Sequence, residues 1–153
     1  MPDLSLSEKL LGLSLALYIV CLPFNTFCVP TGCSDWPAWA TLLFGWMLAG
    51  SGGANATWLA NPLLFLGWAG MIRPDWRYFS VPRIIPALLA YAALALAVSF
   101  YFAKTVISNE AGLARPVTGY ETGYWVWIAS MVCFALCATV HLFERAHDDK
   151  PIP

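Results

Sequence analysis

Four long stretches of the chain carry no charged side chain: residues 10–34, 36–72, 84–103 and 122–143. Each is long enough to cross the hydrocarbon core of a bilayer, which is about 30 Å thick and takes about 20 helical residues. A water-soluble fold has no use for such a series, because its surface needs charged side chains throughout. The pattern therefore predicts an all-α integral membrane protein, a bundle of about four transmembrane helices.

We expect one polytopic transmembrane domain over residues 1–153. Proline, glycine and charged residues at the edges of the uncharged stretches set the bounds of its spans. The spans are about 8–28, 55–72, 83–103 and 123–143. Ser5 or Ser7 is expected to cap the first helix, and Pro23 is expected to kink it near its far end.

The stretch 36–72 admits two layouts. As one helix it would be about 55 Å long, too long for a single crossing. A glycine-rich run at 50–55 and an Asn-Pro pair at 61–62 also interrupt it. In the first layout, a short helix at 37–50 is interfacial or re-entrant and 55–72 crosses. In the alternative both pieces cross, which gives five helices.

Lysine and arginine residues set the expected orientation, because they concentrate in the cytoplasmic loops of membrane proteins. With four crossings and the N-terminus inside, Lys104 and Arg115 lie outside and the other six lie inside. Those six are Lys9, Arg73, Arg77, Arg83, Arg145 and Lys150. We therefore expect a multi-pass protein of a bacterial-type inner membrane, with both termini cytoplasmic. Five crossings with the N-terminus outside remain an alternative.

The composition agrees with a membrane location and excludes some functions. The chain is 59% hydrophobic and 11% charged, whereas soluble domains carry about a quarter charged residues. A formal net charge of −1 argues against nucleic acid as a partner, which favours basic surfaces. No acidic or basic side chain lies at membrane depth in this layout. Ion-coupled transporters, pumps and proton relays usually need such groups, so these activities are disfavoured.

Cys28 and Cys33 are a candidate disulfide across the turn at 30–32, provided that the first loop faces an oxidising compartment. The functional alternative is thiol–disulfide exchange. Such an enzyme would need a second pair of cysteines to relay electrons, and the other outer connector, 104–121, contains none. We favour a structural bond over redox catalysis.

Cys133, Cys137 and His141 recur every four residues on the last helix and share one face. Soft-metal or haem ligation is one interpretation. Close helix packing is the favoured one, because Ala129, Cys133 and Cys137 form a stripe of small side chains. No other span offers a second histidine for a haem iron.

His141, Glu144 and His147 are weak candidates for a metal site at the end of that helix. One helix supplies at most two or three ligands, and no other segment offers an obvious fourth. We favour the interpretation that these side chains are solvated, and we predict no metal and no cofactor.

Two further groups are candidate contact sites. The connector after the second span mixes basic and aromatic side chains suited to lipid headgroups or to a cytoplasmic partner, although an ordinary positive-inside anchor is the favoured interpretation. Its candidate residues are Arg73, Trp76, Arg77 and Arg83. The second group is a candidate cavity at the broken helix, formed by Asn55, Asn61 and Pro62.

These patterns predict no catalytic residues and lead to three hypotheses for function. The favoured one is a small non-enzymatic accessory or scaffold subunit of a larger membrane complex. The alternative is a small transporter, channel or immunity-type protein that uses the break at 50–62. A thiol-redox or metal-dependent membrane enzyme is less favoured. The expected partners are membrane lipids and other membrane protein subunits or a second copy of the chain, but not nucleic acid.

Overall fold

The computed structural model of the chain describes residues 4–33, 37–50, 53–72, 84–107 and 113–148. The described part is mostly helical, as the uncharged stretches predict, but it also contains short strands that the sequence pattern did not predict. The helices are α1 (Leu6–Cys21), α2 (Ala38–Ala49), α3 (Ala60–Ile72), α4 (Ile84–Ser99) and α5 (Thr122–Asp148), with 3-10 segments η1 (Gly53–Leu59) and η2 (Phe100–Phe102). The strands are β1 (Phe27–Cys28), β2 (Thr105–Ile107), β3 (Ala114–Pro116) and β4 (Gly119–Tyr120).

Helix α1 begins at a capping box and ends earlier than expected. The Ser5 side chain accepts a hydrogen bond from the Glu8 backbone, and the Glu8 carboxylate accepts one from the Ser5 N–H at 2.8 Å. The helix stops at Cys21, well short of the expected limit at residue 28. Pro23 therefore lies just beyond the helix rather than at a kink within it, because proline supplies no N–H for continued helical bonding.

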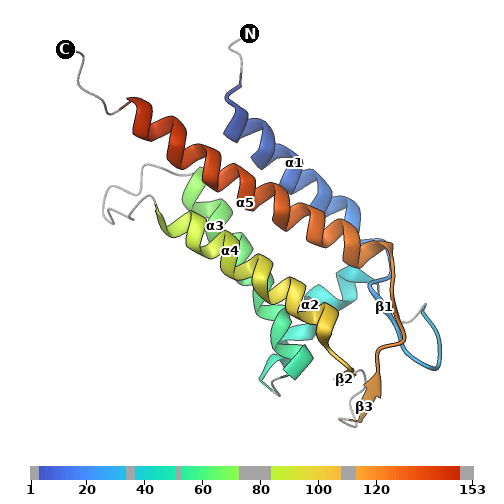
Figure 1. Cartoon of the computed structure of the whole chain (residues 1–153). Coiled ribbons are helices and arrows are strands. Elements are labelled where there is room, and N and C mark those ends of the chain that lie inside the picture. Colours follow the sequence, from blue (N-terminus) through green and yellow to red (C-terminus); the bar gives the residue numbers. More distant parts are fainter. Residues whose placement is uncertain (1–3, 34–36, 51–52, 73–83, 108–112, 149–153) are drawn as a thin grey trace.

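α1, α3, α4 and α5 lie roughly side by side, and both ends of the described chain are at the same end of this group (Figure 1). α1 packs along α5, and α4 packs between α3 and α5. The short strands gather at the opposite end, and α2 lies across the group near them (Figure 1). α2 is fixed to η1 by the Trp58 indole, whose Nε1 donates to the Leu42 carbonyl oxygen at 2.9 Å.

The interior is built from large side chains of α3 and α5 packed against a face of small side chains on α4. Leu64, Met131 and Phe134 are fully buried. The small face of α4 consists of Ala87, Ala90, Ala93 and Ala97. Small side chains let neighbouring helix backbones approach closely, so this face explains why α4 fits between α3 and α5.

Within the described residues, two segments are long and apolar enough to cross a membrane. They are Ile84–Phe102, which joins α4 to η2, and Thr122–Glu144 of α5, with 19 and 23 residues. α1 has 16 residues and α3 has 13, which correspond to about 24 and 20 Å of helix. The stretch 36–72 is divided into α2, η1 and α3, with the division at the glycine-rich run.

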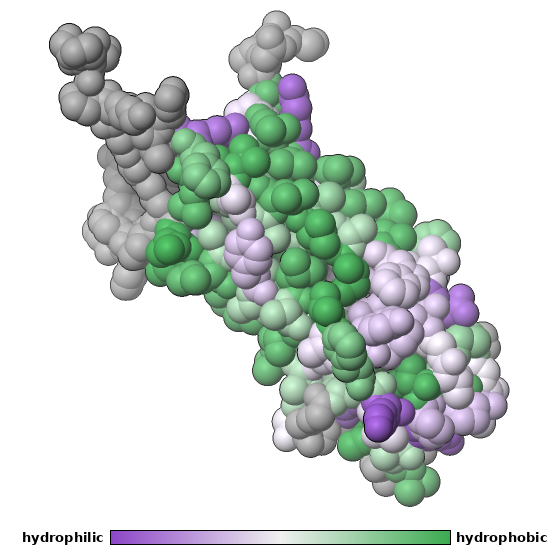
Figure 2. All heavy atoms as spheres, viewed as in Figure 1, coloured by the Kyte–Doolittle hydropathy of each residue, from purple (hydrophilic) through white to green (hydrophobic). Residues whose placement is uncertain are grey.

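The surface is apolar over the middle of the molecule. Figure 2 shows hydrophobic residues covering the central part of one face, while the strongly hydrophilic ones gather toward its two ends. Every α-helix contributes large exposed apolar side chains, which include Ile19 of α1, Met47 of α2, Leu66 of α3, Leu88 of α4 and Phe143 of α5. Soluble monomers rarely expose apolar surface on this scale, so the surface is of the kind that meets lipid or another protein.

Candidate functional site

The strands at one end of the molecule bring the first loop against the start of α5. β1 pairs with β4 in antiparallel register, so that Cys28 lies opposite Gly119. The Thr118 N–H donates to the Cys28 carbonyl oxygen at 2.9 Å, and the Glu121 N–H donates to that of Thr26 at 3.0 Å. We call this end of the molecule, made by residues 25–33, 100–107 and 113–124, the rim.

Gly123 allows the first loop to approach α5. Its N–H donates to the Asn25 carbonyl oxygen at 2.8 Å. A Cβ atom on Gly123 would lie 2.6 Å from that same oxygen and 2.7 Å from the Phe24 carbonyl oxygen. Because both neighbours are backbone atoms, only glycine fits without moving the loop.

Cys28 and Cys33, the cysteine pair singled out from the sequence, are joined by a disulfide bond. The turn between them is closed by mutual backbone hydrogen bonds of Val29 and Gly32, at 3.1 and 2.9 Å. Gly32 has a φ angle of +146°, which glycine adopts readily and other residues do not.

Glu121, which sequence reasoning did not single out, is the third member of this group. Its Oε1 lies 3.3 Å from Cys28 Sγ. The ligand-type atoms of Cys28, Cys33 and Glu121 all lie within 4.8 Å of one another, and this is the one such cluster of metal-ligand residues within the described part of the chain. The spacing of Glu121 in the sequence carries no sign of this contact, because it depends on the pairing of β1 with β4.

The hairpin of β2 and β3 supports the disulfide loop from the side. Val106 pairs with Arg115, and the Arg115 guanidinium donates to the Thr31 hydroxyl at 3.0 Å. The Ile107 N–H donates to the Asn55 Oδ1 at 3.3 Å. The candidate cavity residue Asn55 therefore links η1 to this hairpin.

Aromatic side chains fill the remainder of the rim. The Tyr101 and Tyr120 rings stack with centroids 5.3 Å apart, and the Tyr120 hydroxyl donates to the carbonyl oxygens of Phe100 and Tyr101 at 2.9 and 3.1 Å. Burial, and then the neighbouring Tyr101, raise the pKa of Tyr120 above its ordinary value. Its hydroxyl therefore remains a protonated donor at neutral pH.

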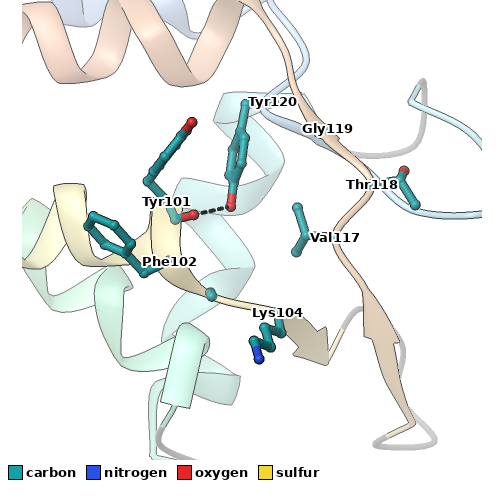
Figure 3. Close-up of a pocket in the computed structure, with 8 residues that line it drawn as sticks. Tyr101, Phe102, Lys104, Val117, Thr118, Gly119 and Tyr120 are labelled. Carbon is teal, nitrogen blue, oxygen red and sulfur yellow. Dashed lines mark hydrogen bonds between the residues drawn. The ribbon is translucent and has the colours of Figure 1, made fainter.

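An open pocket of about 490 Å³ lies between η2 and the segment that leads into β4. Figure 3 shows the Tyr101 and Tyr120 rings side by side at one edge of the pocket and Lys104 at the other. The Phe102 ring points away from its centre (Figure 3). The wall is mostly backbone, tyrosine and small side chains, which identifies no particular ligand.

Asn61 lies in the interior, apart from Asn55. Its side chain is 5% exposed, and its Oδ1 accepts hydrogen bonds from the Tyr18 hydroxyl and the Trp127 indole, both at 3.0 Å. Its Nδ2 donates to the Trp58 carbonyl oxygen at 3.2 Å. Pro62 stands in the first turn of α3, where proline is tolerated. The two asparagines thus make separate sets of contacts.

A second polar group joins α1, α3 and α5. The Ser14 hydroxyl accepts a hydrogen bond from the Trp68 indole at 3.2 Å, and Ser14 also bonds to Ser130. Among the described residues, no buried side-chain nitrogen or oxygen lacks a hydrogen-bond partner. The polar side chains of the interior are therefore satisfied by protein contacts.

The candidate metal ligands of the last helix do not form a cluster within the described side chains. Glu144 accepts a hydrogen bond from the Ser7 hydroxyl at 2.6 Å, which ties the end of α5 to α1. Cys137 is fully buried and lies 3.1 Å from the Ser7 carbonyl oxygen, whereas Cys133 and His141 are only partly buried. The side chain of His147 lies outside the described part, as do Arg73, Trp76, Arg77 and Arg83.

Comparison with known proteins supplies no family for this arrangement. No protein-family model, no curated protein and no solved structure matches the chain.

Proposed function

We propose that this chain is a small non-enzymatic integral membrane protein that serves as an accessory or scaffold subunit of a larger membrane complex. The observation that carries the proposal is the combination of an extensively apolar exterior with hydrogen-bonded polar groups in the interior. Large apolar side chains are exposed on every α-helix, while the buried polar groups bond to one another. Such a molecule offers a large apolar surface for interaction with lipid or with another protein.

The proposed topology has four crossings: α1, η1 with α3, α4 with η2, and α5. Both described ends of the chain lie at the same end of the molecule, which agrees with an even number of crossings (Figure 1). Placing those ends in the cytoplasm of a bacterial-type inner membrane puts the rim and its disulfide on the oxidising side. The aromatic side chains of the rim then lie near the outer headgroups, where such rings are favoured.

α2 is the element that most favours a partner. It is only 12 residues long, about 18 Å, yet it exposes Trp39, Leu43, Phe44, Trp46 and Met47. A helix this short and apolar cannot span the bilayer alone, so it lies in the interface or against a neighbouring subunit. We propose the latter contact for α2, with lipid covering the remaining helices.

The transporter, channel or immunity-type alternative receives less support. This alternative requires a cavity between Asn55 and Asn61. In the structure Asn55 bonds to the β2–β3 hairpin, whereas Asn61 bonds to Tyr18 and Trp127. A pathway through the chain would require the Asn61 bonds to break. The accessory role needs no such rearrangement.

The test is extraction in a mild detergent or a nanodisc-forming polymer, followed by mass spectrometry of what co-purifies. Photo-crosslinkers at Phe44 and Met47 should capture one stoichiometric membrane protein, and a matched crosslinker at Leu88 on α4 should capture chiefly lipid. If the α2 positions also give only lipid and the chain is purified alone, the accessory role is wrong.

The topology is tested separately by reporters fused to each terminus. Both should report the cytoplasm. An N-terminal reporter that is active only outside the cytoplasm would contradict the four-crossing layout and favour five crossings.

A further inference from the structure

We infer that Cys28, Cys33 and Glu121 form a metal site that opens when their disulfide is reduced and that takes a zinc-like divalent cation. In the oxidised protein the two sulfurs are bonded to each other, so they are not available as thiolate ligands. In the reduced protein they would face each other and the Glu121 carboxylate. This inference concerns the rim alone and does not depend on the accessory role proposed above.

Backbone contacts hold the three residues in place without help from the sulfur–sulfur bond. Cys28 is held by the pairing of β1 with β4, and Glu121 is held by the bond from its N–H to Thr26. Cys33 directly follows the turn closed by Val29 and Gly32. Reduction therefore removes the covalent bond but leaves the contacts that keep the side chains close. A site already assembled loses less conformational freedom on binding a metal.

The donor set suits zinc. Zinc binds cysteine thiolates at about 2.3 Å and carboxylate oxygens at about 2.0–2.2 Å in tetrahedral geometry. Ligand atoms around such an ion lie roughly 3.5 Å apart, and Glu121 Oε1 is 3.3 Å from Cys28 Sγ. Only small side-chain movements are needed once the sulfurs separate. Three protein ligands leave one position for water or for a group from another molecule.

The reaction balances with an external dithiol as the reductant. One thiolate of the reductant attacks the Cys28–Cys33 bond and forms a mixed disulfide with one cysteine. The second thiolate then displaces that cysteine, so that the reductant becomes a disulfide and the chain gains two thiols. Zinc then binds the two cysteine sulfurs with release of their two protons. In the reverse step an external disulfide accepts the two electrons and becomes two thiolates, while the Cys28–Cys33 bond re-forms and the zinc ion is released. The rim would thus hold either a disulfide or a metal, but never both.

The experiment uses the full chain in nanodiscs, reduced with a phosphine that is then removed without air. Zinc is measured by elemental analysis, and cobalt(II) serves as a spectroscopic probe because its thiolate complexes absorb by charge transfer. The reduced chain should bind one ion and show this band. The oxidised chain should bind none. Equal metal binding by both forms, or none by the reduced form, would overturn the inference.

Variants separate this site from the other cysteines. Cys28→Ser and Cys33→Ser should each abolish the cobalt band, while Glu121→Gln should keep the band and weaken zinc binding at least tenfold. Cys133→Ser and Glu144→Gln are the controls, since both residues lie on α5 away from the rim, and they should bind as the parent does. Retained binding in Cys28→Ser, or loss of binding in Cys133→Ser, would place the metal elsewhere. Circular dichroism of each variant checks that the helices are intact.

Discussion

Ser14 and Ser130 exchange hydrogen bonds across the contact between α1 and α5. The Ser14 hydroxyl donates to the Ser130 carbonyl oxygen, and the Ser130 hydroxyl donates to the Ser14 carbonyl oxygen, both at 2.9 Å. Both residues are fully buried. The exchange fixes the register of two antiparallel helices, because sliding either by one residue would break both bonds.

Loss of the Ser14 hydroxyl should destabilise the fold measurably. Ser14→Ala removes its bond to Ser130 and also the acceptor for the Trp68 indole. Interhelical hydrogen bonds in membrane proteins average about 0.6 kcal/mol, so we expect a loss of about 1–2 kcal/mol in unfolding free energy. Denaturant titration in micelles measures it. Ser99→Ala is the control, since Ser99 is exposed and bonds only within its own helix; equal effects of the two variants would contradict the prediction.

Asn61 is expected to be a structural residue. Asn61→Leu keeps most of the side-chain volume but leaves the Tyr18 hydroxyl and the Trp127 indole without their acceptor. An unsatisfied buried donor costs about 1–3 kcal/mol, so the variant should be less stable by at least that amount. In the Tyr18→Phe background, the cost of Asn61→Leu should shrink. An unchanged stability of Asn61→Leu would indicate that Asn61 lines a solvated cavity instead.

Gly67 on α3 should tolerate no side chain. A Cβ atom there would lie 2.5 Å from Phe134 Cε1 and 2.8 Å from Cζ, and the Phe134 ring is fully buried. Gly67→Ala should destabilise the protein by about 1–3 kcal/mol, as overpacking does. Gly12→Ala is the matched control, because a Cβ atom at Gly12 meets nothing within 4 Å. That control should be neutral or stabilising, by up to about 1 kcal/mol, and a reversed order would contradict the packing of α3 on α5.

The rim should lose stability at alkaline pH. Burial and the neighbouring Tyr101 raise the pKa of Tyr120 in the folded protein, whereas an unfolded tyrosine ionises near pH 10. The stabilisation is therefore complete below about pH 10 and is lost as the pH rises toward the folded pKa. Thermal unfolding between about pH 8 and 11 should show a steeper decline for the parent than for Tyr120→Phe. Parallel declines would show that Tyr120 is not responsible.

The helical part of the fold was predictable because uncharged stretches of this length have few other uses. The end of α1 was not, since Pro23 is compatible with both a kink and a stop in a membrane helix. Here the loop after Pro23 gains backbone bonds, such as the one from Gly123 to Asn25, that a continued helix would forgo. Local sequence carries no information about such distant partners.

The candidate site was predictable only in part. The spacing of Cys28 and Cys33 singled out the pair, but Glu121 lies 93 residues from Cys28 and reaches it through a two-residue strand. Strands this short have no alternating pattern to detect. A usable signal was present in α1, where Ser7, Ser14 and Cys21 recur every seven residues and are all buried. That repeat marks the face that meets α5.

The pairing of the first helix with the last also orders the events of synthesis. Ser14 and Ser130 are 116 residues apart, so α1 leaves the ribosome long before its partner exists. Until α5 is made, Ser14 cannot form its two hydrogen bonds with Ser130. The nascent chain therefore holds an incomplete bundle until α5 has been made.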